Sequence, residues 1–132
     1  MNIRITPARV YAVTRIAIGL WLLVDPAGFG GKWLVAPQDP LLTGSLIRGA
    51  GGRDLGIGIG LLFAGSPRAW LLLCAFCDAL DATLVFLCRS RFPQHDVVRG
   101  MVGALSYALI GVALAVWAAG KRPAEFESTA TR

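Results

Sequence analysis

Four long apolar segments constrain the fold of this chain more than any other sequence feature. They cover residues 7–24, 46–64, 67–88 and 97–119. As helices, segments of about 18–23 residues are long enough to cross the ~30 Å hydrocarbon core of a bilayer. Only 16% of the 132 residues are charged and 55% are hydrophobic. A soluble domain has about 25% charged residues, and one of this size cannot bury so much apolar surface. The sequence therefore predicts an all-α fold, an integral membrane four-helix bundle.

Capping signals set the expected ends of these helices. Thr6 precedes Pro7 and Ser66 precedes another proline, and both pairs are typical of a helix N-terminus. Ser45 is the expected cap of the second helix, and Gly65 is expected to end it. The connection at Gly65 and Ser66 is so short that the second and third helices should form an antiparallel hairpin. One transmembrane domain, residues 1–120, is predicted, with a polar and disordered tail at residues 121–132.

The longest connection, residues 25–45, is rich in glycine and proline. Its Lys32–Val35 core contains a tryptophan, which favours the headgroup zone of a membrane. Either an interfacial linker or a functional loop fits this pattern. Basic residues near the segment ends weakly favour both termini in the cytoplasm. The side of the termini holds Arg4, Arg9, Arg68, Lys121, Arg122 and Arg132, and the other side holds Lys32, Arg89, Arg91 and Arg99.

Five charged residues lie near the middle of the apolar segments, where an unpaired charge costs at least ~2.5–3.5 kcal/mol. They are Arg15, Arg53, Asp54, Asp78 and Asp81. At about 1.5 Å per residue, Arg15 lies ~13 Å deep, Asp78 ~16 Å and Asp81 ~21 Å from one membrane edge. The second segment runs in the opposite direction and places its charges ~17–20 Å deep. We therefore expect one layer near the midplane, with Asp78 and Asp81 held by Arg15 and Arg53 from neighbouring helices. Asp54 is either a third acceptor in this layer or points elsewhere.

Small residues recur every four positions in the second segment. They are Gly52, Gly56, Gly60 and Ala64. Such a face lets the backbones of two helices touch in lipid. The pattern predicts helix packing, either within the chain or with another copy.

The segments RIAIGLWLLVDP (15–26), RGAGGRDLGIGIGLL (48–62) and CDALDA (77–82) occur in this order. Together they resemble a bacterial family of small four-helix membrane proteins of unknown function. That family is similar in size and layout to DoxX-like membrane proteins. The resemblance covers roughly residues 10–115 and implies an integral membrane protein with four helices. It implies no established reaction and no catalytic residues.

Several other sites are not expected. The formal charge of +5 is scattered, so no nucleic-acid partner is predicted. Cys74 and Cys77 share a helix face with the two aspartates, but structural zinc usually takes four nitrogen or sulfur ligands, so neither a metal nor another cofactor is predicted. Cys88 leaves an odd number of cysteines, which does not favour a disulfide framework. The single histidine, His95, lies in a loop, so no catalytic Ser-His-Asp or Cys-His set is available.

Two functions remain open from the sequence. One is a structural or accessory protein of the bacterial cytoplasmic membrane that packs against itself or a membrane protein partner. The other is a protein that binds a small molecule or couples transport to protons through the charged layer. A dry, fully paired layer would favour the first, and a solvent-accessible cavity reaching Asp78 would favour the second.

Overall fold

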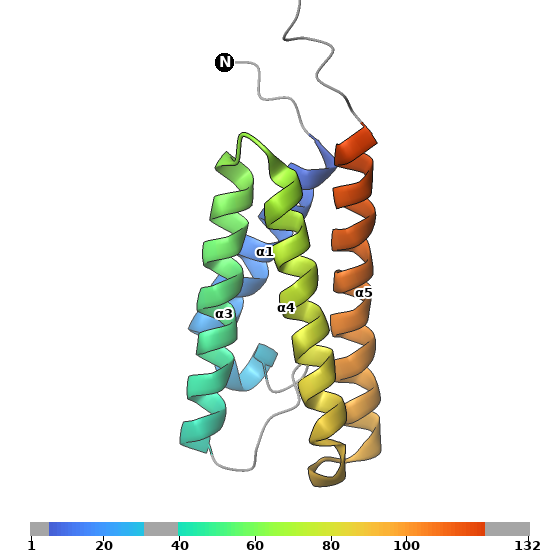
Figure 1. Ribbon diagram of the computed structural model, residues 1–132. Coiled ribbons are helices and arrows are strands. Elements are labelled where there is room, and N and C mark those ends of the chain that lie inside the picture. The colour runs from blue at the N-terminus through green and yellow to red at the C-terminus, as the bar shows by residue number, and fades with distance from the viewer. Residues whose placement is uncertain (1–5, 31–39, 121–132) are drawn as a thin grey trace, which may run out of the picture.

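The computed structural model describes residues 6–30 and 40–120 (Figure 1). The long helices in these ranges are α1 (Pro7–Val24), α3 (Pro40–Phe63), α4 (Pro67–Leu87) and α5 (Gln94–Gly120). A π-helical turn at Pro26–Gly30 follows α1, and a 3₁₀ turn at Arg89–Arg91 lies between α4 and α5. No described residue is in a strand, which confirms the all-α prediction. The expected headgroup segment Lys32–Val35 and the tail at residues 121–132 lie outside the described residues.

The N-terminus of α1 is capped as predicted. The side chain of Thr6 accepts a hydrogen bond from the Arg9 amide at 3.3 Å, and Pro7 occupies the first turn. Ser66 lies at the N-cap of α4 but makes no side-chain cap hydrogen bond. At the other end of α1, Asp25 ends the helix and its carboxylate accepts a hydrogen bond from the Gly28 amide at 2.9 Å.

The start of the second helix was predicted wrongly. α3 begins at Pro40, six residues before the expected Leu46, so Ser45 lies inside the helix and is not its cap. The Ser45 hydroxyl donates instead to the Leu41 carbonyl at 2.9 Å, a bond that a serine inside a helix commonly makes. Proline is the better start signal, because the amide that it lacks has no partner in the first turn. α5 likewise begins at Gln94, three residues before the predicted start.

The long helices pack mainly as two pairs, α1 with α3 and α4 with α5. Backbone touches backbone in the first pair: a Cβ on Gly19 would lie 2.6 Å from the Leu55 amide nitrogen, and one on Gly51 would lie 2.8 Å from the Gly19 carbonyl oxygen. In the second pair, a Cβ on Gly111 would lie 3.2 Å from the Ala75 side chain. Between the pairs lies a small core made by Ala8, Tyr11, Ala12, Ile57, Leu61, Leu71, Cys74 and Ala115.

Successive long helices run in opposite directions, so the start of α1 and the end of α5 lie at the same end of the molecule (Figure 1). α3 and α4 are joined by a bend of only three residues, 64–66, as the predicted hairpin requires. Consequently Arg15, Arg53, Asp78 and Asp81, each near the middle of its helix, come to similar heights.

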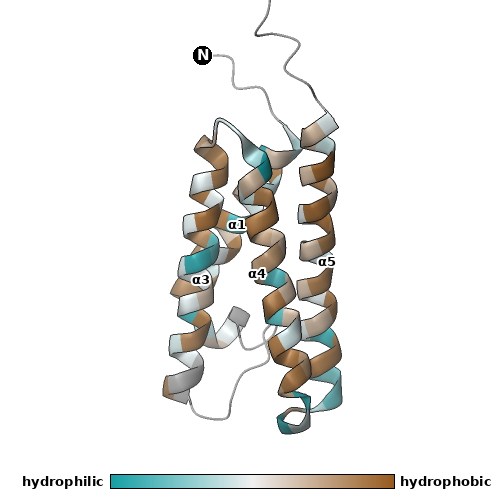
Figure 2. Cartoon of the chain, in the orientation of Figure 1, coloured by the Kyte–Doolittle hydropathy of each residue, from teal (hydrophilic) through white to brown (hydrophobic). Residues whose placement is uncertain are grey.

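Three described helices are long and apolar enough to cross a membrane: α1, α4 and α5. α3 does not meet the same measure, since every stretch of 18 residues within it contains Arg48, Arg53 and Asp54. The ribbon is apolar over most of the long helices, with hydrophilic positions about halfway along α3 and α4 (Figure 2). Large apolar side chains also cover the outside, including Leu109 at 70% exposed and Phe63 at 81%.

Candidate functional site

Arg15 on α1 is the centre of a charged cluster between the two helix pairs. Its Nη1 donates to Asp54 Oδ2 on α3 at 3.2 Å, and its Nη2 donates to Asp78 Oδ2 on α4. The Arg15 side chain is only 4% exposed, and those of its two carboxylate partners are 9% and 6% exposed. One guanidinium therefore joins three helices away from the surface of the chain.

Two tyrosines enclose the same guanidinium. Tyr11, one turn before Arg15, accepts a hydrogen bond from Arg15 Nη2 at 2.8 Å and donates one to the Tyr107 carbonyl on α5 at 3.2 Å. The Arg15 Cζ atom lies 5.2 Å from the centre of the Tyr11 ring and 4.9 Å from that of Tyr107. Both distances are within the range of cation–π attraction. The cluster therefore contacts all four long helices of the described chain.

Asp54 connects Arg15 to a second arginine. Its Oδ1 accepts hydrogen bonds from Arg53 Nε and Nη2 at 3.2 and 3.1 Å. Arg53 also makes a two-pronged contact with Asp81 on α4, with distances of 3.0 and 2.8 Å. Such forked pairs are the strong form of an arginine–carboxylate contact. The result is a continuous chain of charges, which we call the charge layer; its members are Asp78, Arg15, Asp54, Arg53 and Asp81.

The charge layer has a closed end and an open end. At the closed end Arg15 and Asp78 are both buried. At the open end the side chain of Arg53 is 30% exposed and that of Asp81 is 38% exposed. The structure thus brings together all five charged residues that the sequence predicts at the midplane. They differ in burial, with the Arg15 end closed and the Arg53–Asp81 end partly exposed.

One donor in the layer has no partner. Arg15 Nε is buried and makes no hydrogen bond to the described residues. A buried donor in this state costs about 1–3 kcal/mol. Formal charge is also unequal, because three carboxylates face two guanidiniums and leave one negative charge in excess. Both features mark places where the layer could take up a further group.

The predicted small-residue face divides into different environments. A Cβ on Gly60 would lie 2.3 Å from the Trp70 ring of α4, so this glycine leaves room for a side chain of a neighbouring helix. Ala64 lines a cavity of about 240 Å³ at the end of α3. Gly52 and Gly56, by contrast, face open space, with no atom within 4 Å of a Cβ built on either. The close contact with α1 is made by Gly51 and Gly58, on another face of α3.

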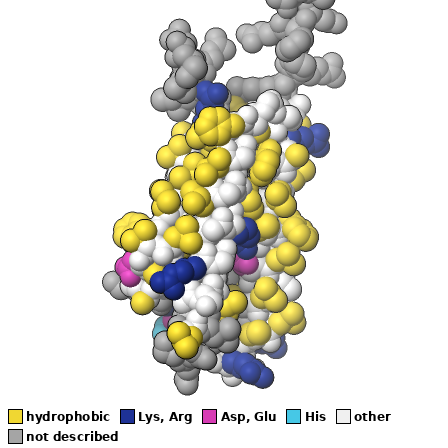
Figure 3. Space-filling model, turned by 90° about the vertical axis from the view of Figure 1, so that its left-hand side faces the viewer, with side chains coloured by type: hydrophobic (Ala, Val, Ile, Leu, Met, Phe, Trp, Pro, Cys, Tyr) yellow, Lys and Arg dark blue, Asp and Glu magenta, His cyan; other side chains and the backbone are white. Residues whose placement is uncertain are grey.

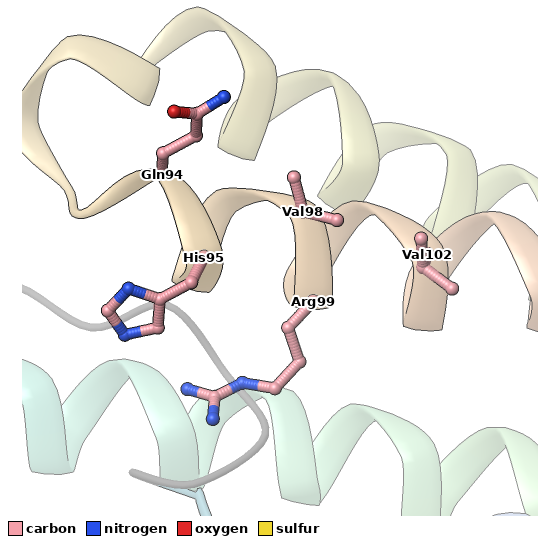
Figure 4. Close-up of a pocket in the computed structure, with 5 residues that line it drawn as sticks. All are labelled: Gln94, His95, Val98, Arg99 and Val102. Atoms are coloured by element: carbon pink, nitrogen blue, oxygen red, sulfur yellow. The ribbon is translucent and has the colours of Figure 1, made fainter.

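The histidine lies away from the charge layer, at the start of α5. His95 lines a cavity of about 720 Å³ on the surface, together with Gln94, Val98, Arg99 and Val102 (Figure 4). Asp96 accepts from Arg99 at 2.6 Å and lies 3.3 Å from His95 Nε2. No hydroxyl or thiol is among the lining side chains, so this cavity offers no nucleophile beside the imidazole. Neither this cavity nor the one at Ala64 is lined by a residue of the charge layer.

Metal-ligand geometry is absent from the part of the chain that the structure describes, where no three His, Cys, Asp or Glu side chains are grouped to hold an ion. Cys74 is buried one turn before Asp78, Cys77 is half-buried and Cys88 is exposed, and all three are free thiols. Sequence reasoning missed the tyrosines. Tyr11 lies four residues before Arg15 on the same helix face, a signal that could have found it, whereas Tyr107 is brought in only by the packing of α5.

Comparisons with known proteins give no match: no family model, no curated protein and no solved structure matches the chain. What the charge layer can do follows from its own chemistry. It can hold the two helix pairs together, or it can bind a proton or a cationic group that neutralises its one excess negative charge.

Proposed function

We propose that this chain is a small multi-pass protein of the bacterial cytoplasmic membrane, a structural or accessory component in which the charge layer holds the two helix pairs together. Four helices cross the bilayer in this proposal, in the layout of the small four-helix family that the sequence resembles. A structural role is simpler than a role in binding or transport, because ion pairs and aromatic rings close the buried end of the charge layer.

The apolar outer surface supports the membrane location. α5 is the clearest case, because large apolar side chains form an exposed stripe along its length: Val102 is 59% exposed, Leu109 70% and Val116 67%, and their spacing of seven residues places them on one face. Soluble monomers rarely expose such extended apolar surface. Lipid is the solvent in which a helix of this kind is stable.

α3 is the least apolar of the four proposed spans, and the charge layer explains how it can cross. Arg53 and Asp54 both have partners of opposite sign, on α1 and α4. Paired charges inside a helical membrane protein face the interior and one another. The cost of inserting α3 is therefore offset only when the other helices are present.

The single observation that carries the structural role is the burial of Arg15 between carboxylates from α3 and α4. Its two carboxylate partners are in different helix pairs. Removing Arg15 leaves the Asp78 carboxylate buried without compensation, which typically costs about 3–5 kcal/mol. The contact of Arg15 with Asp54 and Asp78 therefore holds the two helix pairs together, and we call it the lock.

A double-mutant cycle on Arg15 and Asp78 tests the lock. Arg15→Gln and Asp78→Asn should each lower the free energy of unfolding in detergent, and the double variant should recover part of the loss. The matched cycle on Arg53 and Asp81 should show weaker coupling, because that pair is 30% and 38% exposed. Coupling below about 0.5 kcal/mol in both cycles would show that the layer does not hold the pairs together.

A second candidate is favoured by the excess negative charge and the unpartnered Arg15 Nε. In this alternative the layer binds a small molecule or carries a proton, and a carboxylate is the working group. Proton entry into vesicles containing the purified protein, followed with a pH-sensitive dye under an imposed potential, separates the two. The structural role requires no flux above that of empty vesicles. Proton flux in the wild type that is lost in a folded Asp78→Asn variant would contradict the structural role and support proton transport.

A further inference from the structure

The open end of the charge layer is unusual for a protein in lipid. Arg53 and Asp81 lie near the middle of α3 and α4, yet about a third of each side chain is exposed, 30% and 38%. Ionised groups in the hydrocarbon core normally face protein or water, because exposure to lipid costs several kcal/mol. Some further surface is therefore needed to cover this pair.

The face of α3 next to Arg53 is shaped to accept a helix. Gly49, Gly52 and Gly56 are exposed, and a Cβ on any of them would meet no atom within 4 Å. Spacings of three and four residues place them on one helix face. A band of exposed backbone runs along this side of the molecule, with basic and acidic side chains beside it at about half height (Figure 3). Small residues in this arrangement allow close helix contact in lipid.

We propose that this face binds a second copy of the same chain, with α3 against α3 about a two-fold axis along the membrane normal. The charge pattern selects this partner. Arg53 and Asp81 present one positive and one negative group side by side, so a two-fold axis can bring Arg53 of each copy near Asp81 of the other. A surface of this kind is complementary to itself. The inference rests on the proposed membrane location.

Apolar side chains flank the same place on α4. Cys77 and Leu84 lie four residues before and three residues after Asp81, on its side of the helix. Cys77 is half-buried and Leu84 is 58% exposed. Contact with a second copy would cover these side chains together with the ion pair, so polar and apolar parts of the interface are continuous.

Energy transfer between donor- and acceptor-labelled full-length chains in lipid vesicles tests the dimer. The wild type should exceed random co-localisation over a range of lipid dilutions. Gly52→Leu and Gly56→Leu should weaken association by about tenfold or more, which corresponds to 1.4 kcal/mol or more. Helix content should stay at the wild-type level, because both sites are open within one chain. Gly103→Leu on α5 is the matched control, an equally open glycine outside the proposed interface, and should dimerise normally.

Several outcomes would overturn the dimer. Wild-type transfer at the random level would mean that lipid or another protein covers the face. Wild-type association in both folded leucine variants would place the interface elsewhere. Should either variant misfold, counting photobleaching steps of the wild type still decides between one copy and two. Flotation with the vesicles separates the two proposals, since a chain that does not float refutes the membrane location, whereas a floating monomer refutes only the dimer.

Discussion

The hydroxyl of Tyr11 joins the buried charges to the backbone of α5. It accepts from Arg15 and donates to the Tyr107 carbonyl. The ion pairs of the charge layer connect α1, α3 and α4. Among the described residues, the Tyr11 hydroxyl extends this network to α5 by a hydrogen bond. A search of the sequence for charged residues overlooks Tyr11, because a tyrosine on an apolar helix is usually interpreted as a packing residue.

Tyr11→Phe should therefore lower the free energy of unfolding by about 1–3 kcal/mol, the cost of leaving buried polar partners unsatisfied. The ring and its contact with Arg15 remain, so the loss reports on the hydroxyl. Tyr107→Phe is the control, because Tyr107 contributes its ring and its backbone carbonyl to the cluster and phenylalanine keeps both. Chemical unfolding in detergent measures the difference, and equal stability of the two variants would contradict a bridging role for Tyr11.

At the scale of the helix, apolar length predicted the elements well and glycine spacing predicted their contacts poorly. α1 has the predicted bounds because a cap and a proline coincide at its start. α3 carries glycines on more than one face, and the four-residue repeat through Gly52 and Gly56 was the more regular pattern. Gly51 and Gly58, seven residues apart, also share a face, and theirs is the face that meets α1. Sequence alone does not show which face a neighbouring helix occupies.

This difference predicts opposite effects of alanine at two glycines. At Gly19 the new Cβ would lie 2.6 Å from the Leu55 nitrogen and 2.7 Å from the Gly51 oxygen, both backbone atoms. Separating α1 from α3 should cost about 1–3 kcal/mol, as overpacking does. At Gly103 the Cβ would meet nothing within 4 Å, so Gly103→Ala should gain about 0.5–1 kcal/mol from helix propensity. Thermal unfolding followed by circular dichroism measures both, and a stabilised Gly19→Ala variant would show that the two backbones do not approach this closely.

For the whole molecule, depth counting anticipated that five charges meet, because straight helices of known rise keep residues at predictable heights. It did not anticipate how they share partners. Asp54, which the sequence left as a third acceptor or a residue pointing elsewhere, lies between both arginines. Which carboxylate each arginine meets depends on how each helix is rotated about its axis. That rotation is set by contacts between helices, such as Gly51 against α1, and the sequence of one segment does not show them.

The number of crossings is the last expectation to test, and α3 decides it. Among the described helices, α1, α4 and α5 qualify as spans by length and composition, and three crossings would place the two termini on opposite sides of the membrane. Because the charges of α3 are paired with α1 and α4, we expect it to cross as well, which brings both termini to one side. Topology reporters at Met1 and Arg132 should therefore report the cytoplasm, and one placed after Lys32 should report the opposite side. Opposite results at Met1 and Arg132 would mean that α3 does not cross the membrane, and that its Arg53 and Asp54 reach their partners from the membrane surface.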